Sequence, residues 1–381
     1  MNKLILLVLV LLTAGCKEKF ISPAPTVVTG YIVVEGVVNN EGLATNITLS
    51  RTTNLYDTSK KYETGATVTV EDSHNTSMLL TENSAGIYTI YNLHLDTTLK
   101  YRLAIKTSNN EEYLSDFVSV KKNPLIDSIN WERDNNGVHI FINTHDPLNN
   151  TLYYQWEFEE TWEFHSGKSS ILKYLQSPPP SFQKIGVAFR ELDDPNIYIC
   201  WQFNASSNIF LGSSAKLSQD VIHLPLVTIA PASVKLSVLY SILVKQYVWS
   251  KEGYEFLERM KNNTESIGSV FDAQPSELNG NIHCTTNPKQ PVIGFFNICT
   301  IQENRIFIHN TDLPYWNYNY ACNEIVIENN RDSIMIKADG LLPTTPQKMD
   351  AFGSILTFYA SPAECVDCTL SGTNIKPTYW P

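Results

Sequence analysis

The sequence lacks the motifs and charge clusters that identify the commonest enzymes and nucleic-acid-binding proteins. It contains no Gly-x-Ser-x-Gly, which marks the nucleophile of many hydrolases, and no His-Glu-x-x-His, which holds zinc on one helical face. The formal net charge is −11 and the lysines and arginines form no cluster, so we expect no nucleic-acid partner. From these absences we predict a protein that is not an enzyme and that has no catalytic residues, no metal site and no cofactor.

No apolar run is long enough to cross a membrane as a helix, but a shorter one opens the chain. Leu4–Leu12 would span about 14 Å as a helix, against a hydrocarbon core of about 30 Å. Lys3 before this run and the small residues after it are typical of a secretory signal. Thr-Ala-Gly-Cys resembles a bacterial lipobox, in which Cys16 becomes the N-terminus and carries acyl chains such as palmitate. We therefore predict a lipoprotein signal peptide over residues 1–15 and attachment to the lipid bilayer through Cys16.

An ordinary cleaved signal followed by a chance cysteine is the alternative. Residues 16–30 are predicted to form a tether, because Pro23 and Pro25 favour an extended chain that stands off the bilayer.

Cysteine is absent between Cys16 and position 200, so the remaining cysteines all lie in the second half of the chain. An even number of cysteines in an exported chain indicates disulfides, and 15 pairings are open if all six pair. Cys200, in an apolar run, could equally be a free core thiol. Cys365 and Cys368 have redox spacing, but the chain ends at Pro381, which leaves no room for a thioredoxin-type fold, and structural disulfides are favoured. The candidates are Cys200, Cys284, Cys299, Cys322, Cys365 and Cys368.

Short alternating strands separated by turn residues predict a mostly β protein. Residues 31–122 are predicted to form an immunoglobulin-like β-sandwich, and residues 123–381 a fibronectin type III-like β domain with insertions and a disulfide-stapled C-terminal extension. A hairpin is expected at Asp134-Asn135-Asn136-Gly137, where Asn-Gly supplies positive φ angles. Residues 165–185 are predicted to be an irregular insertion. One helix is expected from Ser250, which can cap it, to about Asn262.

Two aromatic-rich stretches are candidates for binding. Tyr315, Trp316, Tyr318 and Tyr320 alternate in part with asparagines, and flat rings with amides suit a sugar, a peptide or a protein partner. The alternative is that Tyr318 and Tyr320 are buried in a strand.

The second stretch carries several glutamates beside tryptophans. On a strand, Glu157, Glu159 and Glu163 would line one face, while Trp156, Glu160 and Trp162 would line the other. This pattern favours an acidic solvent face over an aromatic core rather than a pair of glycosidase carboxylates.

Three segments of the second half resemble one lipoprotein family. They are Phe271–Ile282, Pro291–Phe296 and the ending Glu364–Pro381, and Val33–Gly36 and Leu49–Thr52 also match. The family is a Bacteroidota group catalogued as domain of unknown function 4249. The resemblance implies an outer-membrane lipoprotein that acts as a non-enzymatic accessory or ligand-binding partner of a TonB-dependent transporter. An envelope structural protein or adhesin, and a surface hydrolase, are the alternatives.

Overall fold

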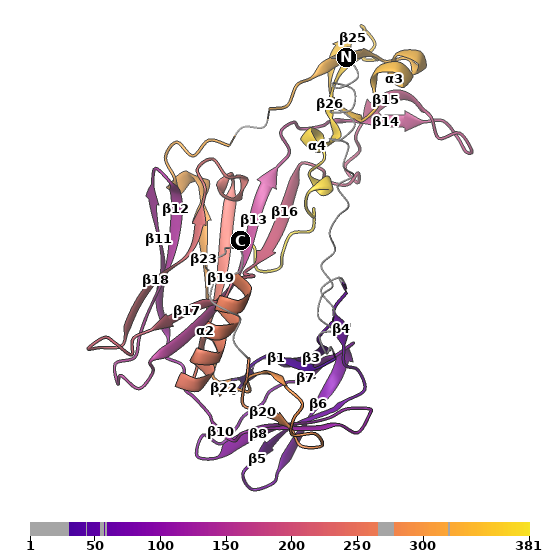
Figure 1. The fold of residues 1–381 in the computed structure, drawn as a ribbon. Helices are drawn as coiled ribbons and strands as arrows, with labels where there is room; N and C mark the ends of the chain where they lie inside the picture. Colours follow the sequence, from indigo (N-terminus) through magenta and orange to yellow (C-terminus); the bar gives the residue numbers. More distant parts are fainter. Residues whose placement is uncertain (1–29, 43, 54–56, 58, 266–277, 319–320) are drawn as a thin grey trace, which may run out of the picture.

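The computed structural model describes residues 30–42, 44–53, 57, 59–265, 278–318 and 321–381. In this part of the chain the fold is mostly β, as predicted, and its buried apolar side chains form three main clusters. We call the corresponding parts the N-terminal, central and distal units. Figure 1 shows the N-terminal and distal units at opposite ends of the central one. No helix among these residues is long and apolar enough to span a bilayer. The signal peptide, Cys16, most of the tether, Phe271–Glu277 and Tyr320 lie outside the described residues.

The N-terminal unit is built from ten strands of residues 32–119 and three that return much later in the sequence. Alternation along the predicted strands is confirmed: Val68 and Val70 are fully buried, with more exposed residues between them. The first ten are β1 (Ile32–Glu35), β2 (Val38–Asn39), β3 (Thr45–Arg51), β4 (Lys61–Tyr62), β5 (Thr67–Asp72), β6 (Ser77–Ser84), β7 (Ile87–Ile90), β8 (Lys100–Lys106), β9 (Glu112–Ser115) and β10 (Val118–Ser119).

The first strand of the N-terminal unit, β1, ends just before Gly36. The φ of Gly36 is +133°, and a Cβ there would lie 2.3 Å from the carbonyl oxygen of Asn46. Only glycine fits such a close approach, so the chain bends there and continues as β2.

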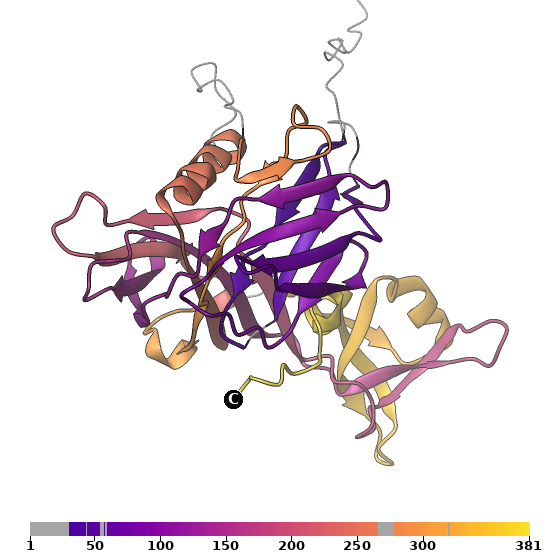
Figure 2. The same ribbon diagram turned by 90° about the horizontal axis from the view of Figure 1, so that it is seen from below.

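Residues 282–299 complete the N-terminal unit. β20 (Ile282–Cys284) pairs with β9, β21 (Ile293–Gly294) pairs in parallel with β1, and β22 (Ile298–Cys299) pairs in parallel with β2. Figure 2 shows this orange segment lying along the indigo strands. Ile282, Phe296 and Ile298 are therefore part of the same core as Ile47 and Leu49.

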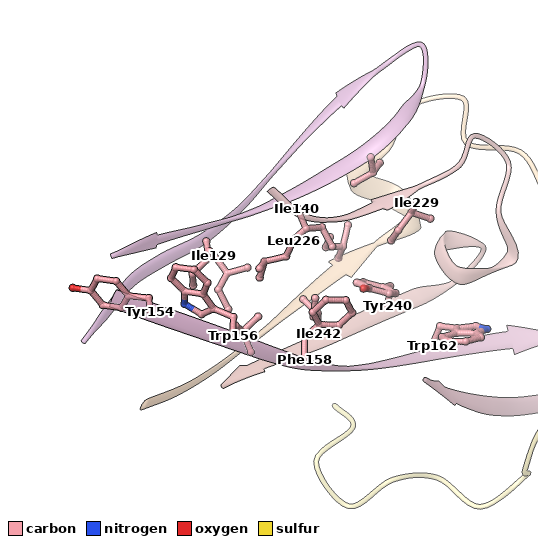
Figure 3. Close-up of a cluster of buried hydrophobic side chains, with 14 of the residues drawn as sticks. Ile129, Ile140, Tyr154, Trp156, Phe158, Trp162, Leu226, Ile229, Tyr240 and Ile242 are labelled. Atoms are coloured by element: carbon pink, nitrogen blue, oxygen red, sulfur yellow. The ribbon is translucent and has the colours of Figure 1, made fainter. Parts of the chain in front are cut away.

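The central unit has two sheets that face each other. A three-stranded sheet contains β11 (Ile126–Asp134), β12 (Gly137–His145) and β18 (Val221–Ile229). The second sheet has the order β16-β13-β19-β23, with β17 paired to β13. Figure 3 shows side chains of both sheets pointing toward one another, including Ile140 and Leu226 from one and Trp156 and Ile242 from the other. The second sheet comprises β13 (Tyr153–His165), β16 (Ile199–Ala205), β17 (Phe210–Ser213), β19 (Leu239–Val248) and β23 (Gln302–His309).

The glutamate-rich strand has the predicted two faces except at Glu163, whose side chain is only 17% exposed and accepts a hydrogen bond from the Trp380 indole N–H at 2.9 Å. Along β13, Trp156 and Trp162 are buried whereas Glu157 and Glu159 are exposed. Glu160, on the tryptophan side, is only 1% exposed.

The predicted hairpin is also present, between β11 and β12. Asp134 pairs with Gly137, so the turn consists of Asn135 and Asn136 alone. The positive φ, +134°, falls on Gly137, where a Cβ would lie 2.1 Å from the carbonyl oxygen of Ile229.

The expected helix is α2 (Lys251–Glu265). The Ser250 hydroxyl accepts a hydrogen bond from the Gly253 backbone N–H at 3.1 Å, which caps the first turn as predicted. The predicted end at Asn262 is wrong, because the helix continues to Glu265.

The distal unit corrects the prediction that residues 165–185 are an irregular insertion. They contribute to a hairpin of β14 (Leu172–Gln176) and β15 (Lys184–Phe189), on which Leu172 and Val187 are buried. Their core partners, Ile327 and Phe358, lie far away in the sequence. The other elements of the distal unit are β24 (Ile325–Glu328), α3 (Arg331–Lys337), β25 (Leu341–Met349), β26 (Ile355–Pro362) and α4 (Ala363–Val366). Elsewhere along the chain, short 3-10 turns occur at η1 (Val234–Leu236), η2 (Asn310–Asp312) and η3 (Cys368–Leu370).

Two disulfides hold the C-terminal region. Cys200 bonds to Cys368 and Cys322 bonds to Cys365, so the alternative of a free Cys200 thiol is wrong. Cys365 and Cys368 do form structural disulfides, each with a distant cysteine. Cys284 and Cys299, also candidates for disulfides, are instead free and buried, because their thiols lie in different core clusters. Burial raises the pKa of the Cys299 thiol to about 12, which keeps it protonated and unreactive at neutral pH.

Candidate functional site: the junction cleft

A cleft of about 1100 Å³ lies where the N-terminal unit meets the central unit. We call it the junction cleft. Its walls come from separate segments: the connection 121–125, the loop between β12 and β13, the start of β13, and the junction of β19 with α2. Its volume suits a small organic ligand or a short peptide.

A network of buried amides holds Asn123 and Pro124, two residues that line the junction cleft. Gln246, fully buried on β19, accepts a hydrogen bond from the Trp156 indole at 2.9 Å. Its own amide nitrogen donates to the Asn123 side-chain oxygen at 2.9 Å, to the Pro124 carbonyl at 3.0 Å and to the Thr144 hydroxyl at 3.2 Å. Because every polar group of Gln246 has a partner, the network holds the connection 121–125 in one position.

The returning segment 297–300 clamps the same connection from the other side. The Thr300 hydroxyl accepts from the Asn123 backbone N–H at 2.9 Å, and the Lys121 N–H donates to the Ile298 carbonyl at 3.0 Å. The Asn297 side chain donates to the Val248 carbonyl at 2.9 Å. The two units are thus joined by buried hydrogen bonds beside the cleft, which favours a preformed shape.

The loop that forms one wall is held by hydrogen bonds to the Asp146 carboxylate. Asp146 accepts hydrogen bonds from the backbone N–H groups of Leu148, Asn150 and Thr151, each at 2.9 Å. Partial burial acts to raise the pKa of Asp146, but these N–H donors outweigh it and the pKa is lowered. Asp146 is therefore charged at neutral pH and stabilises the loop.

A histidine and an aspartate form an ion pair at the rim of the cleft. His145 Nδ1 lies 2.7 Å from Asp127 Oδ2, and both side chains are well exposed. The hydrogen bond and the charge of Asp127 raise the pKa of His145 above its ordinary value. Among the described residues, no hydroxyl group of the cleft lining forms a hydrogen bond with His145.

Part of the mouth of the cleft is apolar. Leu125 and Leu148 are 71% and 74% exposed and line it together with Pro124 and Pro147. Trp249, only 6% exposed, also lines the cleft, and its indole N–H has no partner among the described residues. An apolar rim with one unused donor and flanking charges suits a ligand that is partly apolar and carries a polar acceptor group.

The structure separates the aromatic residues that the sequence grouped as contact candidates. Tyr315 is 92% exposed and has a positive φ of 62°, so it projects into solvent. Trp316 is only 5% exposed, donates its indole N–H to the Ser233 carbonyl at 3.1 Å and belongs to the central core, which leaves it little surface to offer a partner. Tyr318 lies in irregular backbone rather than in a strand, and Tyr320 lies outside the described residues.

Sequence reasoning missed the junction cleft. Its lining comes from segments between Glu41 and Gln302, and no single segment carries a recognisable motif. The predicted boundary between residues 122 and 123 falls within the lining, but only the pairing of the N-terminal unit with residues 282–299 shows that a cleft forms there. No group of three or more metal-ligating side chains is present among the described residues.

Comparison with known proteins identifies a family without an assigned activity. The family model described as "Domain of unknown function (DUF4249)" matches residues 18–305. The match includes the junction cleft and stops before β24, the first of the three late strands of the distal unit. No curated protein shows significant similarity to the chain.

Proposed function

Because the chain belongs to the DUF4249 family, whose model matches residues 18–305, we propose that it is a non-enzymatic, lipid-anchored protein of the outer membrane. It holds a ligand in the junction cleft and acts as an accessory of a TonB-dependent transporter. The observation that carries the ligand-binding part is the junction cleft itself, with a volume of about 1100 Å³ and a lining segment, 121–125, that buried amides hold in place by hydrogen bonds. A preformed cleft binds its ligand without first having to order its own walls.

The anchoring part of the proposal rests on the sequence. Leu4–Leu12 followed by Cys16 is typical of an acylated export product. Two or more acyl chains on Cys16 hold a protein stably at a bilayer, since each buried methylene contributes about 0.8 kcal/mol.

The partner part is supported by the surface of the distal unit, which carries many exposed large apolar side chains. Such a surface is typical of protein contact sites. The exposed apolar side chains lie on the β14–β15 hairpin and its flanks, on β24, on α3 and at the β25–β26 turn. They include Leu175, Phe182, Phe189, Leu192, Val326, Met335, Ile336 and Phe352.

Purification from detergent-solubilised native membranes tests the partnership. We expect an outer-membrane barrel to co-purify with the wild-type chain in comparable amount. The Cys16→Ala variant should take up no radiolabelled palmitate and should leave the membrane fraction. Repeated recovery of the acylated protein without a barrel would contradict the accessory role.

Substitution at the mouth tests the cleft. Leu148→Arg places a charge on the apolar rim, whereas Leu79→Arg, at a 60% exposed position of β6, is a matched control on the N-terminal unit. Native mass spectrometry of protein purified from its host should show a retained small molecule in the wild type and in the control, but not in Leu148→Arg. Equal retention in all three proteins would contradict binding in the cleft, and chemical turnover of the retained molecule would contradict a non-enzymatic role.

A further inference from the structure

A second pocket, of about 540 Å³, lies at the edge strand β16 of the central unit. Its lining combines residues of β16 and β13 with Lys235 of η1 and the C-terminal segment 371–373. That segment is fixed to β16 by a pair of backbone hydrogen bonds between Trp201 and Thr373, at 2.7 and 2.9 Å. The C-terminal segment therefore forms a stable wall, and we call this site the edge pocket.

A buried charge pair beneath the edge pocket makes its base electrically neutral. Glu160 is 1% exposed, and the Lys235 ammonium lies 2.7 Å from both of its carboxylate oxygens. The Tyr240 hydroxyl donates to the same carboxylate at 2.9 Å, and the Asn204 amide nitrogen donates to it at 2.8 Å. Lys235 thus neutralises Glu160, and its charge is not available to attract an anionic ligand.

The side chains around this pair keep hydrogen-bonding groups unused. The Trp162 indole N–H has no partner within the described part of the chain, although Trp162 is only 7% exposed and lines the pocket. Figure 3 shows the Trp162 nitrogen at the end of the ring that points away from Phe158 and Tyr240. A buried donor without a partner costs free energy, so a site that retains one is a candidate for completion by a ligand.

Two amide carbonyls supply acceptors beside this donor. Gln202 donates its amide nitrogen to the Ser371 carbonyl at 2.6 Å, and Asn204 donates its own to Glu160. Neither side-chain carbonyl accepts a hydrogen bond from another described residue. Because the amide nitrogens are held, the two carbonyl oxygens have fixed positions.

We propose that the edge pocket binds a neutral sugar. A sugar hydroxyl both donates and accepts, so it can satisfy the Trp162 N–H and the carbonyls of Gln202 and Asn204 together. The cancelled charge of Glu160 and Lys235 disfavours a carboxylate or phosphate ligand. This site lies apart from the junction cleft in its lining residues, and the proposal does not depend on a transporter partner.

Binding of defined sugars to the purified full-length mature chain tests the proposal. The probes are glucose, maltose and N-acetylglucosamine, with glucuronate as the anionic counterpart, measured by calorimetry and by saturation-transfer NMR. We expect at least one neutral sugar to bind saturably and glucuronate to bind at least about tenfold more weakly than that sugar. Absence of binding by all three neutral sugars, or tighter binding of glucuronate, would overturn the proposal.

Three variants locate the binding. Trp162→Phe removes the indole N–H and should weaken the best neutral sugar about threefold to tenfold, the range for one hydrogen bond. Trp249→Phe is the matched control, because it removes another partnerless indole N–H that lies in the junction cleft, and it should leave sugar affinity unchanged. Gln202→Leu, at the strand edge, should also weaken sugar binding. It provides a second test of the edge pocket if Trp162→Phe does not fold. Unchanged affinity in the folded edge-pocket variants, or equal losses in Trp249→Phe, would place the sugar elsewhere and overturn the assignment.

Discussion

The N-terminal and distal units are both β structures, but they are stabilised by different means. The N-terminal core is large and includes fully buried side chains such as Ile47, Leu49 and Tyr88. It contains one cysteine, Cys284, which is free. The distal core is small, and its buried members are Leu172, Val187, Ile327, Ile334, Ala338, Ile355, Phe358 and Ala360.

The distal unit compensates for its small core with covalent bonds. The Cys322–Cys365 disulfide joins the segment before β24 to α4, and the Cys200–Cys368 disulfide joins β16 of the central unit to the chain just after α4. A unit that buries little apolar surface gains stability from crosslinks that reduce the freedom of its unfolded chain. Of these two units, the one with the large core therefore has no disulfide among its described residues, whereas the one with the small core is crosslinked.

Removing the distal crosslink should have the largest effect. Cys322→Ser together with Cys365→Ser opens a loop of sequence separation 43 and should lower the free energy of unfolding of the distal unit by about 4 kcal/mol. Hydrogen exchange of β24 and β26 should accelerate, whereas exchange of β3 and β5 should not change. Equal acceleration in both units would show that the units unfold as one and would break the comparison.

Core truncation in the N-terminal unit should have the next largest effect. Leu49→Ala removes a fully buried side chain and should cost about 3 kcal/mol in denaturant unfolding, because a cavity remains in a core without crosslinks. Leu79→Ala, at a 60% exposed position of the same unit, is the control and should cost less than about 0.5 kcal/mol. Similar losses for the two variants would mean that the N-terminal core does not carry the stability of its unit.

Mild acid should distinguish the units through an ion-pair cluster of the N-terminal unit. Arg51 contacts Glu63 at 2.6 Å and Glu111 at 2.7 Å. The hydrogen bond from Arg51 lowers the pKa of Glu111 below its ordinary value of 4.5, against an opposing effect of burial. A lowered folded-state pKa contributes stability above the unfolded-state pKa, and this stability is lost as the pH falls through the folded-state value.

Glu111→Gln should therefore reduce the stability of the N-terminal unit by roughly 1 kcal/mol at neutral pH and flatten its decline below about pH 4.5. Thermal unfolding as a function of pH measures both effects. Glu112→Gln, whose partner Lys106 is 53% exposed, is the neighbouring control and should change little. If stability fell with acid in Glu111→Gln as it does in the wild type, the ion-pair cluster would not contribute to the pH dependence of this unit's stability.

The sequence alone was sufficient to predict strands whose pattern of buried and exposed residues follows from their own alternation of apolar and polar side chains. β5, β12 and the first half of β13 alternate between buried and more exposed residues because each packs one face into a core. The β14–β15 hairpin was not predictable in this way, since its apolar residues have core partners beyond position 325. Likewise, only pairing in space shows that β20, β21 and β22 belong to the N-terminal unit.

The candidate sites were less predictable than the strands for the same reason. The alternation that placed Trp162 and Glu160 on one face of β13 was readable from the sequence. The partners that make this face a pocket, Lys235 and the segment 371–373, come from distant parts of the chain. A hydrogen-bonding motif assembled from such segments has no fixed spacing, so a search by motif cannot detect it.

The smallest effect on stability, but a large one on association, is expected at the exposed apolar surface of the distal unit. Ile336 is 80% exposed on α3, so Ile336→Asp should change the free energy of unfolding by less than about 0.5 kcal/mol. If this surface contacts the transporter, the same variant should lose the barrel during purification from solubilised membranes, because a carboxylate would be desolvated in the contact. Lys337→Asp, at the next exposed position of the same helix, also adds a carboxylate but removes no apolar side chain, and should retain more of the barrel. Full retention by Ile336→Asp would assign the contact to another surface, and the exposed side chains of the distal unit would then reflect only its small core.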